Sequence, residues 1–187
     1  MTEKNVILIG MPGAGKSTVG VVLAKKLGYS FTDSDLVIQE QTGRLLYQLI
    51  EAYGEEGFLE IENKINATLV LSGHVIATGG SVVYGEEAME HLSEIGCVVY
   101  LKLSYKELTE RLGDLHKRGV VLKEGYTLED LYRERVPLYE KWADITITCD
   151  GRNIRDIAAS RRWKEAIRNK EKAVYALKKE RQLFEFV

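Results

Sequence analysis

Short segments rich in apolar residues alternate along this chain with longer ones in which apolar positions recur every three or four residues. The short segments predict five strands, at about residues 5–10, 30–33, 74–79, 97–102 and 145–149. The first strand is followed by helical spacing that ends at Gly28, a residue typical of a helix C-cap. This alternation predicts a three-layer α/β/α fold, in which helices cover both faces of a five-stranded parallel sheet.

Polar and glycine-rich residues follow three of these strands at their carboxyl ends. Gly10–Ser17 follows the first strand, Asp33 and Asp35 lie at the end of the second, and Gly79 and Gly80 follow the third. Ligands of open parallel sheets bind at the carboxyl ends of the strands. The three segments are therefore expected to meet in one cleft.

The segment Gly10–Ser17 fits the phosphate-binding pattern G-x-x-x-x-G-K-[ST], placed between a strand and a helix. Glycines let backbone N–H groups point at one anion, Lys16 adds charge for the β- and γ-phosphates, and the Ser17 hydroxyl is a Mg²⁺ ligand. An ordinary glycine turn would leave Lys16 and Ser17 unexplained. The pattern predicts a P-loop NTPase that binds ATP and Mg²⁺ through Gly13, Ala14, Gly15, Lys16, Ser17 and Thr18.

The sequence Asp33-Ser34-Asp35 is a second candidate for chemistry. We expect these two carboxylates, two residues apart on an extended segment, to point to opposite sides. Phosphoryl transfer needs a group near Mg²⁺ and a group that orients or deprotonates the attacking hydroxyl. We assign Asp33 to the metal and Asp35 to the acceptor; the alternative is a turn or a helix cap, where aspartate is common.

Three arginines are candidates for binding negative charge. Cationic side chains stabilise the charge that develops on a transferred phosphoryl group. Arg118 lies in a basic, glycine-containing stretch that indicates a lid at about residues 111–125, which Arg111 begins. Arg135 could hold an anionic substrate by a bidentate fork. The alternative for each is a solvated surface arginine.

The composition fits a soluble globular protein. Of 187 residues, 45% are hydrophobic and 29% charged, and the net charge of −2 does not favour nucleic-acid binding. Cys97 and Cys149 lie in apolar runs and are expected to be reduced thiols of a cytoplasmic protein. No signal segment is recognised, and no apolar run approaches the ~20 residues of a membrane span.

We expect a kinase domain over residues 1–160, with a helical substrate cap at about 35–71, and a basic helical extension at 161–187. The extension carries nine Lys or Arg and four Asp or Glu. One interpretation is a helix that packs Trp163 and Ile167 on the domain; the alternative is an oligomer or partner contact. We expect a monomer that acts on a small molecule.

In this order the segments resemble the shikimate kinases, within the nucleoside monophosphate kinase-like P-loop group, over about residues 5–158. The phosphate loop, the D-x-D of Asp33 and Asp35, the two-glycine turn and the R-x-P-L-Y segment from Arg135 carry the resemblance. A substrate-domain signature adds to it: Thr42-Gly43-Arg44, Gly54-Glu55, Phe58 and Glu62. The resemblance implies transfer of the ATP γ-phosphoryl group to shikimate, giving shikimate 3-phosphate in aromatic amino acid biosynthesis.

The resemblance also implies roles for individual residues. Catalytic roles fall to Lys16, Asp35 and Arg118. Substrate contacts fall to Asp35, Phe58, Gly79, Gly80 and Arg135. Beyond the phosphate loop, nucleotide contacts fall to Arg111, Arg118 and Arg152. The metal-side residues are Ser17 and Asp33.

Three positions depart from the family's pattern. Leu59 stands where the family has an arginine that helps hold the shikimate carboxylate, Ser81 replaces a third glycine, and Gly119 replaces a lid proline. A hydrogen bond to a charged group is worth roughly 1.5–3 kcal/mol, or ~10- to 150-fold in binding. Arg44 is a candidate to compensate. The alternatives are a kinase of another polyol or sugar-acid metabolite, or a nucleotide-binding regulatory protein with little turnover.

Overall fold

The computed structural model describes residues 4–112, 126–163, 165 and 167–170. Five strands form one parallel sheet in the order β2-β3-β1-β4-β5. Their bounds are β1 Asn5–Ile9, β2 Ser30–Asp33, β3 His74–Ala77, β4 Gly96–Lys102 and β5 Ile145–Thr148. The predicted parallel sheet is confirmed, with strand ends within two residues of those expected.

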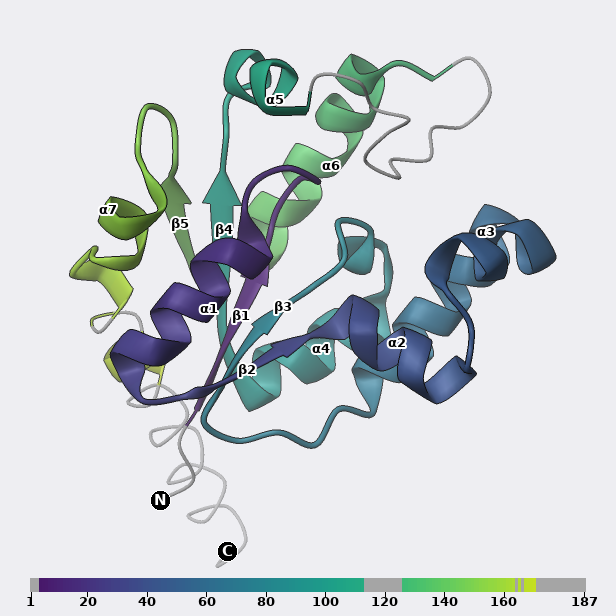
Figure 1. Ribbon diagram of the computed structural model, residues 1–187, viewed down its shortest axis with the longest axis horizontal. Coiled ribbons are helices and arrows are strands. Elements are labelled where there is room, and N and C mark those ends of the chain that lie inside the picture. Colours follow the sequence, from purple (N-terminus) through teal and green to yellow (C-terminus); the bar gives the residue numbers. More distant parts are fainter. Residues whose placement is uncertain (1–3, 113–125, 164, 166, 171–187) are drawn as a thin grey trace, which may run out of the picture.

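The central strand β1 is buried along its whole length because strands pair with it on both sides. Leu8 lies opposite Ala77 of β3 and Val99 of β4. This register brings the carboxyl ends of the three strands to one edge of the sheet (Figure 1). Each of these strands leads directly into a loop, so the loops lie side by side above that edge.

Helices cover the sheet in two layers and also occupy the region where a substrate cap is expected. The helices α1 and α7 pack together on one face, while α4 and α6 lie on the other (Figure 1). The described helices are α1 Lys16–Leu27, α2 Ser34–Thr42, α3 Leu46–Ala67, the 3₁₀ turn η1 Val82–Tyr84, α4 Glu86–Ile95, α5 Tyr105–Leu112, α6 Leu128–Trp142 and α7 Ile154–Ala158. The region expected to form the cap, at about 35–71, therefore consists mainly of two helices, α2 and α3.

The cap has a small apolar core of its own, formed by Ile38, Leu49 and Phe58. Helix α3 is kinked at Gly54, whose backbone (φ 70°) lies where residues other than glycine are strained. The kink separates the first turns of α3, which are largely exposed, from the part that carries Phe58 toward the sheet. A glycine is thus needed to let one helical segment reach both places.

The start of the C-terminal extension packs on the sheet domain. Trp163 is buried in the main core, where its indole N–H donates to the Ile157 carbonyl at 2.8 Å, and Ile167 packs against the same core. Lys170 pairs with Asp144 at 2.8 Å. These contacts agree with the interpretation that Trp163 and Ile167 pack on the domain; residues 171–187 lie outside the described part.

Both cysteines are buried free thiols, as expected. Burial raises the pKa of Cys97 to about 12 and that of Cys149 to about 11, so both stay protonated and inert at neutral pH. Among the described residues no helix is long and apolar enough to cross a membrane.

Candidate functional site

The phosphate loop joins β1 to α1 and forms one wall of the site. Gly13 and Gly15 have positive φ angles (82° and 88°), which turn the backbone toward the start of α1. The Lys16 ammonium group is buried and donates to the Gly10 and Met11 carbonyls at 2.7 and 3.1 Å. Burial lowers the pKa of Lys16 to about 8. A buried cation at a helix N-terminus is suited to meet a phosphate.

Asp33 lies beside Ser17, the hydroxyl residue at the end of this loop. The Ser17 hydroxyl donates to Asp33 Oδ2 at 2.8 Å, and Asp33 Oδ1 accepts the Asp35 backbone N–H at 3.1 Å. Asp33 is thus also the N-cap of α2, which the alternative interpretation expected. The hydroxyl and the carboxylate are hard oxygen donors side by side, the donor type that Mg²⁺ prefers.

The reason given for separating Asp33 from Asp35 was wrong. On an extended segment, side chains two residues apart point to the same side, so that geometry would not have separated the two carboxylates. They are separated because β2 ends at Asp33 and Asp35 lies in the first turn of α2. The start of the helix turns Asp35 away from Ser17 and toward Gly79. Burial raises the pKa of Asp35, and the Asp33 carboxylate adds to the rise.

A cavity of about 620 Å³ lies between the phosphate loop and the cap. The phosphate loop, the first turn of α2, helix α3, the turn after β3 and helix α6 all contribute to its walls. The lining residues are Pro12, Gly13, Gly15, Lys16, Ser17, Thr18, Asp35, Leu46, Tyr47, Ile50, Glu55, Phe58, Leu59, Glu62, Thr78, Gly79, Gly80, Ser81 and Arg135. All five expected substrate contacts therefore meet in one place.

Two carboxylates press on Gly79. A methyl group placed on Gly79 would lie 2.9 Å from Asp35 Oδ1 and would clash with Glu62 Oε1. Glycine is thus required because both carboxylates need this space. Glu62 is buried, its Oε2 accepts the Ser81 hydroxyl at 2.6 Å, and burial raises its pKa to about 7 despite that hydrogen bond.

Arg135 reaches the cavity from α6, where aromatic side chains hold it. Its Nε donates to the Tyr84 hydroxyl at 3.2 Å, and its guanidinium carbon lies 5.2 Å from the centre of the Tyr84 ring. The side chain is 7% exposed. Gly80 allows it to approach the phosphate loop, since a methyl group there would lie 2.9 Å from Pro12 and 3.2 Å from Arg135.

The residue expected to replace the missing arginine does not do so. The Arg44 guanidinium carbon lies 5.8 Å from the centre of the Tyr53 ring, and the side chain is exposed outside the cavity lining. Leu59 itself lines the cavity. Among the described residues, Lys16 and Arg135 are the cations of this cavity.

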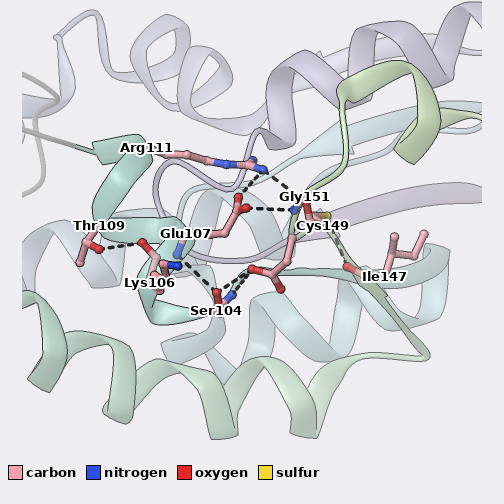
Figure 2. A network of polar contacts seen from close by, with 9 residues as sticks. Ser104, Lys106, Glu107, Thr109, Arg111, Ile147, Cys149 and Gly151 are labelled. Atoms are coloured by element: carbon pink, nitrogen blue, oxygen red, sulfur yellow. Dashed lines mark hydrogen bonds and ion pairs between the residues drawn. The ribbon is translucent and has the colours of Figure 1, made fainter.

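The expected nucleotide contact Arg111 lies on α5, away from the acceptor cavity. Figure 2 shows its guanidinium group between Glu107 and the loop after β5. One nitrogen lies 3.0 Å from Glu107 Oε2 and 3.3 Å from the Cys149 carbonyl, while Glu107 Oε1 accepts the Gly151 N–H at 2.9 Å. Glu107 therefore fixes α5 to that loop and orients Arg111.

Of the two remaining expected nucleotide contacts, the structure describes Arg152 but not Arg118. Arg152 follows Gly151 in the same loop and donates to the Thr148 and Asp156 carbonyls at 3.3 and 2.8 Å. Arg118 and the rest of residues 113–125 lie outside the described part of the chain.

Sequence reasoning gave no role at the site to Glu62, Ser81 or Tyr84, although Glu62 belonged to the substrate-domain signature. Glu62 had a signal, because it follows Phe58 by one helical turn and therefore faces the same cavity. Tyr84 had none, since its contact with Arg135 joins segments 51 residues apart. Ser81 was noted as a departure from a glycine, and the structure supplies its partner, Glu62.

Comparison with known proteins identifies relatives of this chain. The family model described as "Shikimate kinase" matches residues 12–169. The shikimate kinase of Haemophilus influenzae is 40% identical over 158 residues, which cover 82% of this chain and 88% of that protein. The shikimate kinase of Actinobacillus succinogenes is 41% identical over 163 residues, or 84% and 93% of the two chains.

A solved structure is similar to this chain in fold as well as in sequence. The shikimate kinase from Acinetobacter baumannii in complex with shikimate superposes with a TM-score of 0.75 at 34% identity. The match covers 84% of this chain and 89% of that one.

Proposed function

Because this chain belongs to the shikimate kinase family, it is an ATP-dependent phosphotransferase that acts on an alcohol, and we propose the roles that its residues play in phosphorylating shikimate. The single observation that carries the proposal is one cavity that holds both halves of a kinase site. Lys16 and Ser17 line its phosphate side, and Asp35 and Arg135 line its acceptor side. A protein that only binds nucleotide has no need of the second pair.

On the phosphate side, we propose that Lys16 leaves the Gly10 and Met11 carbonyls and pairs with the phosphates of ATP. Ser17 and Asp33 hold Mg²⁺ or its waters, since their oxygens lie 2.8 Å apart beside the loop. The metal neutralises the charge on the phosphates when it is bound. Arg111 and Arg152 bind on the adenine side, and Arg118 adds positive charge at the phosphates.

On the acceptor side, Asp35 receives the hydroxyl that attacks the γ-phosphorus. Its raised pKa makes it a stronger base than a solvated aspartate, which suits a group that takes a proton in the transition state. Arg135 binds the carboxylate of shikimate, and Phe58 packs on its ring. Gly79 and Gly80 make room for the side chains of Asp35, Glu62 and Arg135, which line the cavity that the acceptor enters.

The experiment replaces Asp35 with asparagine and uses Glu40→Gln, an exposed change on the same helix, as the matched control. We expect Asp35→Asn to keep its affinity for Mg²⁺·ATP and to lose ~10²-fold or more of shikimate-dependent ADP release. Glu40→Gln should behave as the wild type. Full turnover by Asp35→Asn would remove Asp35 from the mechanism, and turnover of other polyols but not shikimate would favour a different acceptor.

We also propose that the chain works as a cytoplasmic monomer on its small-molecule substrate. Support comes from the two buried, protonated thiols, which suit a reducing compartment, and from the packing of Trp163 into the core. Sedimentation of the full chain tests the monomer: a dimer at micromolar concentration would contradict it.

A further inference from the structure

The Tyr84 hydroxyl lies between two neighbouring side chains of α6 and binds both of them. It donates to Glu134 Oε1 at 2.5 Å and accepts from Arg135 Nε at 3.2 Å. Tyr84 stays protonated, because burial and the hydrogen bond to Glu134 raise its pKa to about 12. A guanidinium group only donates and a carboxylate accepts, so a hydroxyl placed between the two groups satisfies both.

Glu134 is itself fixed through its second oxygen. Its Oε2 accepts the Tyr126 hydroxyl at 2.7 Å, so rotation of the carboxylate would break at least one of two hydrogen bonds. A further hydrogen bond links the same helix to the turn after β3, since the Tyr139 hydroxyl donates to the Gly80 carbonyl at 2.6 Å. The groups that surround Arg135 are therefore held in place relative to the cavity wall.

The bond at Nε determines which part of the Arg135 guanidinium group is left for a ligand. An arginine presents its N–H donors as a rigid fork, through Nε and one Nη or through the two Nη groups. Because Tyr84 occupies Nε, the Nη groups remain for the acceptor, and Nη1 lies beside Gly80, which lines the cavity. The Tyr84 ring also lies against the guanidinium group, whose carbon is 5.2 Å from the ring centre.

This cavity depends on the orientation of Arg135 more than a site with two acceptor cations would. Leu59 lines the wall where the family resemblance leads us to expect an arginine, and Arg44 lies outside the lining. Among the described residues of the cavity, Lys16 is the other cation, and it serves the phosphates in the proposed function. An arginine that is fixed before binding loses less side-chain freedom when the acceptor arrives, which improves affinity.

We propose that Tyr84 and Glu134 are positioning residues, which together hold the Arg135 guanidinium group so that its Nη groups face the carboxylate of the acceptor. They act through Arg135, because neither is among the described residues that line the cavity. The inference rests on the proposed function, in which Arg135 binds the carboxylate of shikimate, and adds two residues to it.

The test is a double-mutant cycle that measures KM and kcat for shikimate. Tyr84→Phe keeps the ring and removes the hydroxyl, so KM should rise ~10-fold, the low end for a hydrogen bond to a charged group, with kcat within ~2-fold. In an Arg135→Lys background, which offers no Nε to Tyr84, the same change should raise KM less than ~2-fold. A merely structural role of Tyr84 would raise KM equally in both backgrounds. The matched control is Tyr132→Phe, which removes a hydroxyl of α6 that donates to the Leu103 carbonyl outside this network and should leave KM unchanged.

Glu134 gives a second test that leaves the Tyr84 side chain intact. Glu134→Ala should also raise KM for shikimate, and Glu134→Gln should restore most of the affinity because its amide oxygen still accepts from Tyr84. Binding of Mg²⁺·ATP shows which variants are folded. If Tyr84→Phe does not bind Mg²⁺·ATP, the two Glu134 variants decide.

The outcomes separate the inference from the proposed function. An unchanged KM in folded Tyr84→Phe or Glu134→Ala, or an equal rise in both backgrounds, overturns the inference and leaves the proposed function standing. If Arg135→Lys itself leaves KM for shikimate unchanged, the assignment of Arg135 to the carboxylate fails and the inference fails with it. A wild type that does not turn over shikimate overturns the proposed function as a whole.

Discussion

Replacing Glu62 with glutamine should stabilise the protein at neutral and higher pH. Burial raises the pKa of Glu62 from its ordinary 4.5 to about 7, so the folded state holds a proton that the unfolded state has released between these values. The free energy of unfolding of the wild type therefore falls as pH rises through this window. At about 1.4 kcal/mol per pKa unit, the full effect is ~3 kcal/mol. Glutamine has no proton to lose and can still accept from Ser81.

The assay is urea unfolding followed by tryptophan fluorescence, using the buried Trp163 as reporter, at intervals from pH 5 to 8.5. The difference in stability between Glu62→Gln and the wild type should grow by ~2.5 kcal/mol over this range, toward a more stable variant, since part of the effect already lies below pH 5. Glu60→Gln is the control, because Glu60 is 75% exposed and its removal should leave the profile parallel to the wild type. If the stability of Glu62→Gln also runs parallel to that of the wild type across this pH range, the raised pKa of Glu62 is refuted.

Four further changes test other parts of the site. Leu59→Arg should lower KM for shikimate ~10- to 150-fold, because it adds a second cation for the carboxylate of shikimate. Leu59→Met is the control and should leave KM unchanged. An unchanged KM in Leu59→Arg would count against a substrate carboxylate beside residue 59. Gly79→Ala places a methyl group against Asp35 and Glu62. KM for the acceptor should therefore rise at least ~10-fold while ATP binding stays intact. An unchanged KM would show that the two carboxylates move aside freely. Lys16→Ala should abolish measurable turnover, and retained activity would contradict its role at the phosphates. Glu107→Gln should raise KM for ATP by up to ~5-fold, since the partly exposed ion pair between Glu107 and Arg111 is worth at most ~1 kcal/mol. KM for the acceptor should not change. An effect on KM for shikimate alone would contradict the assignment of Arg111 to the nucleotide side.

The sheet and the phosphate side of the site followed from the sequence because local patterns encode them. A strand, a glycine loop and a helix are consecutive in the chain, so Gly10–Ser17 could be placed without knowledge of distant contacts. The parallel order β2-β3-β1 brought Asp35, Gly79 and Gly80 together beside the phosphate loop, as the strand-end rule predicts.

The acceptor side depended on contacts that no local pattern encodes. Arg135 is oriented by Tyr84, 51 residues away, and Ser81 finds its partner in Glu62 across 19 residues. The suggestion that Arg44 compensates for Leu59 was wrong, because the cap places Arg44 over Tyr53 outside the cavity. The side chains of Asp33 and Asp35 lie apart, but not for the reason expected from the sequence: helix α2 begins between the two residues.

The most direct test of the account is ADP release by the purified chain with Mg²⁺·ATP, measured with and without shikimate. The account predicts strong shikimate-dependent release, with shikimate 3-phosphate as the product. ATP binding without shikimate-dependent release would contradict it, because the nucleotide side would then be intact while the acceptor that Asp35 and Arg135 receive would be another molecule.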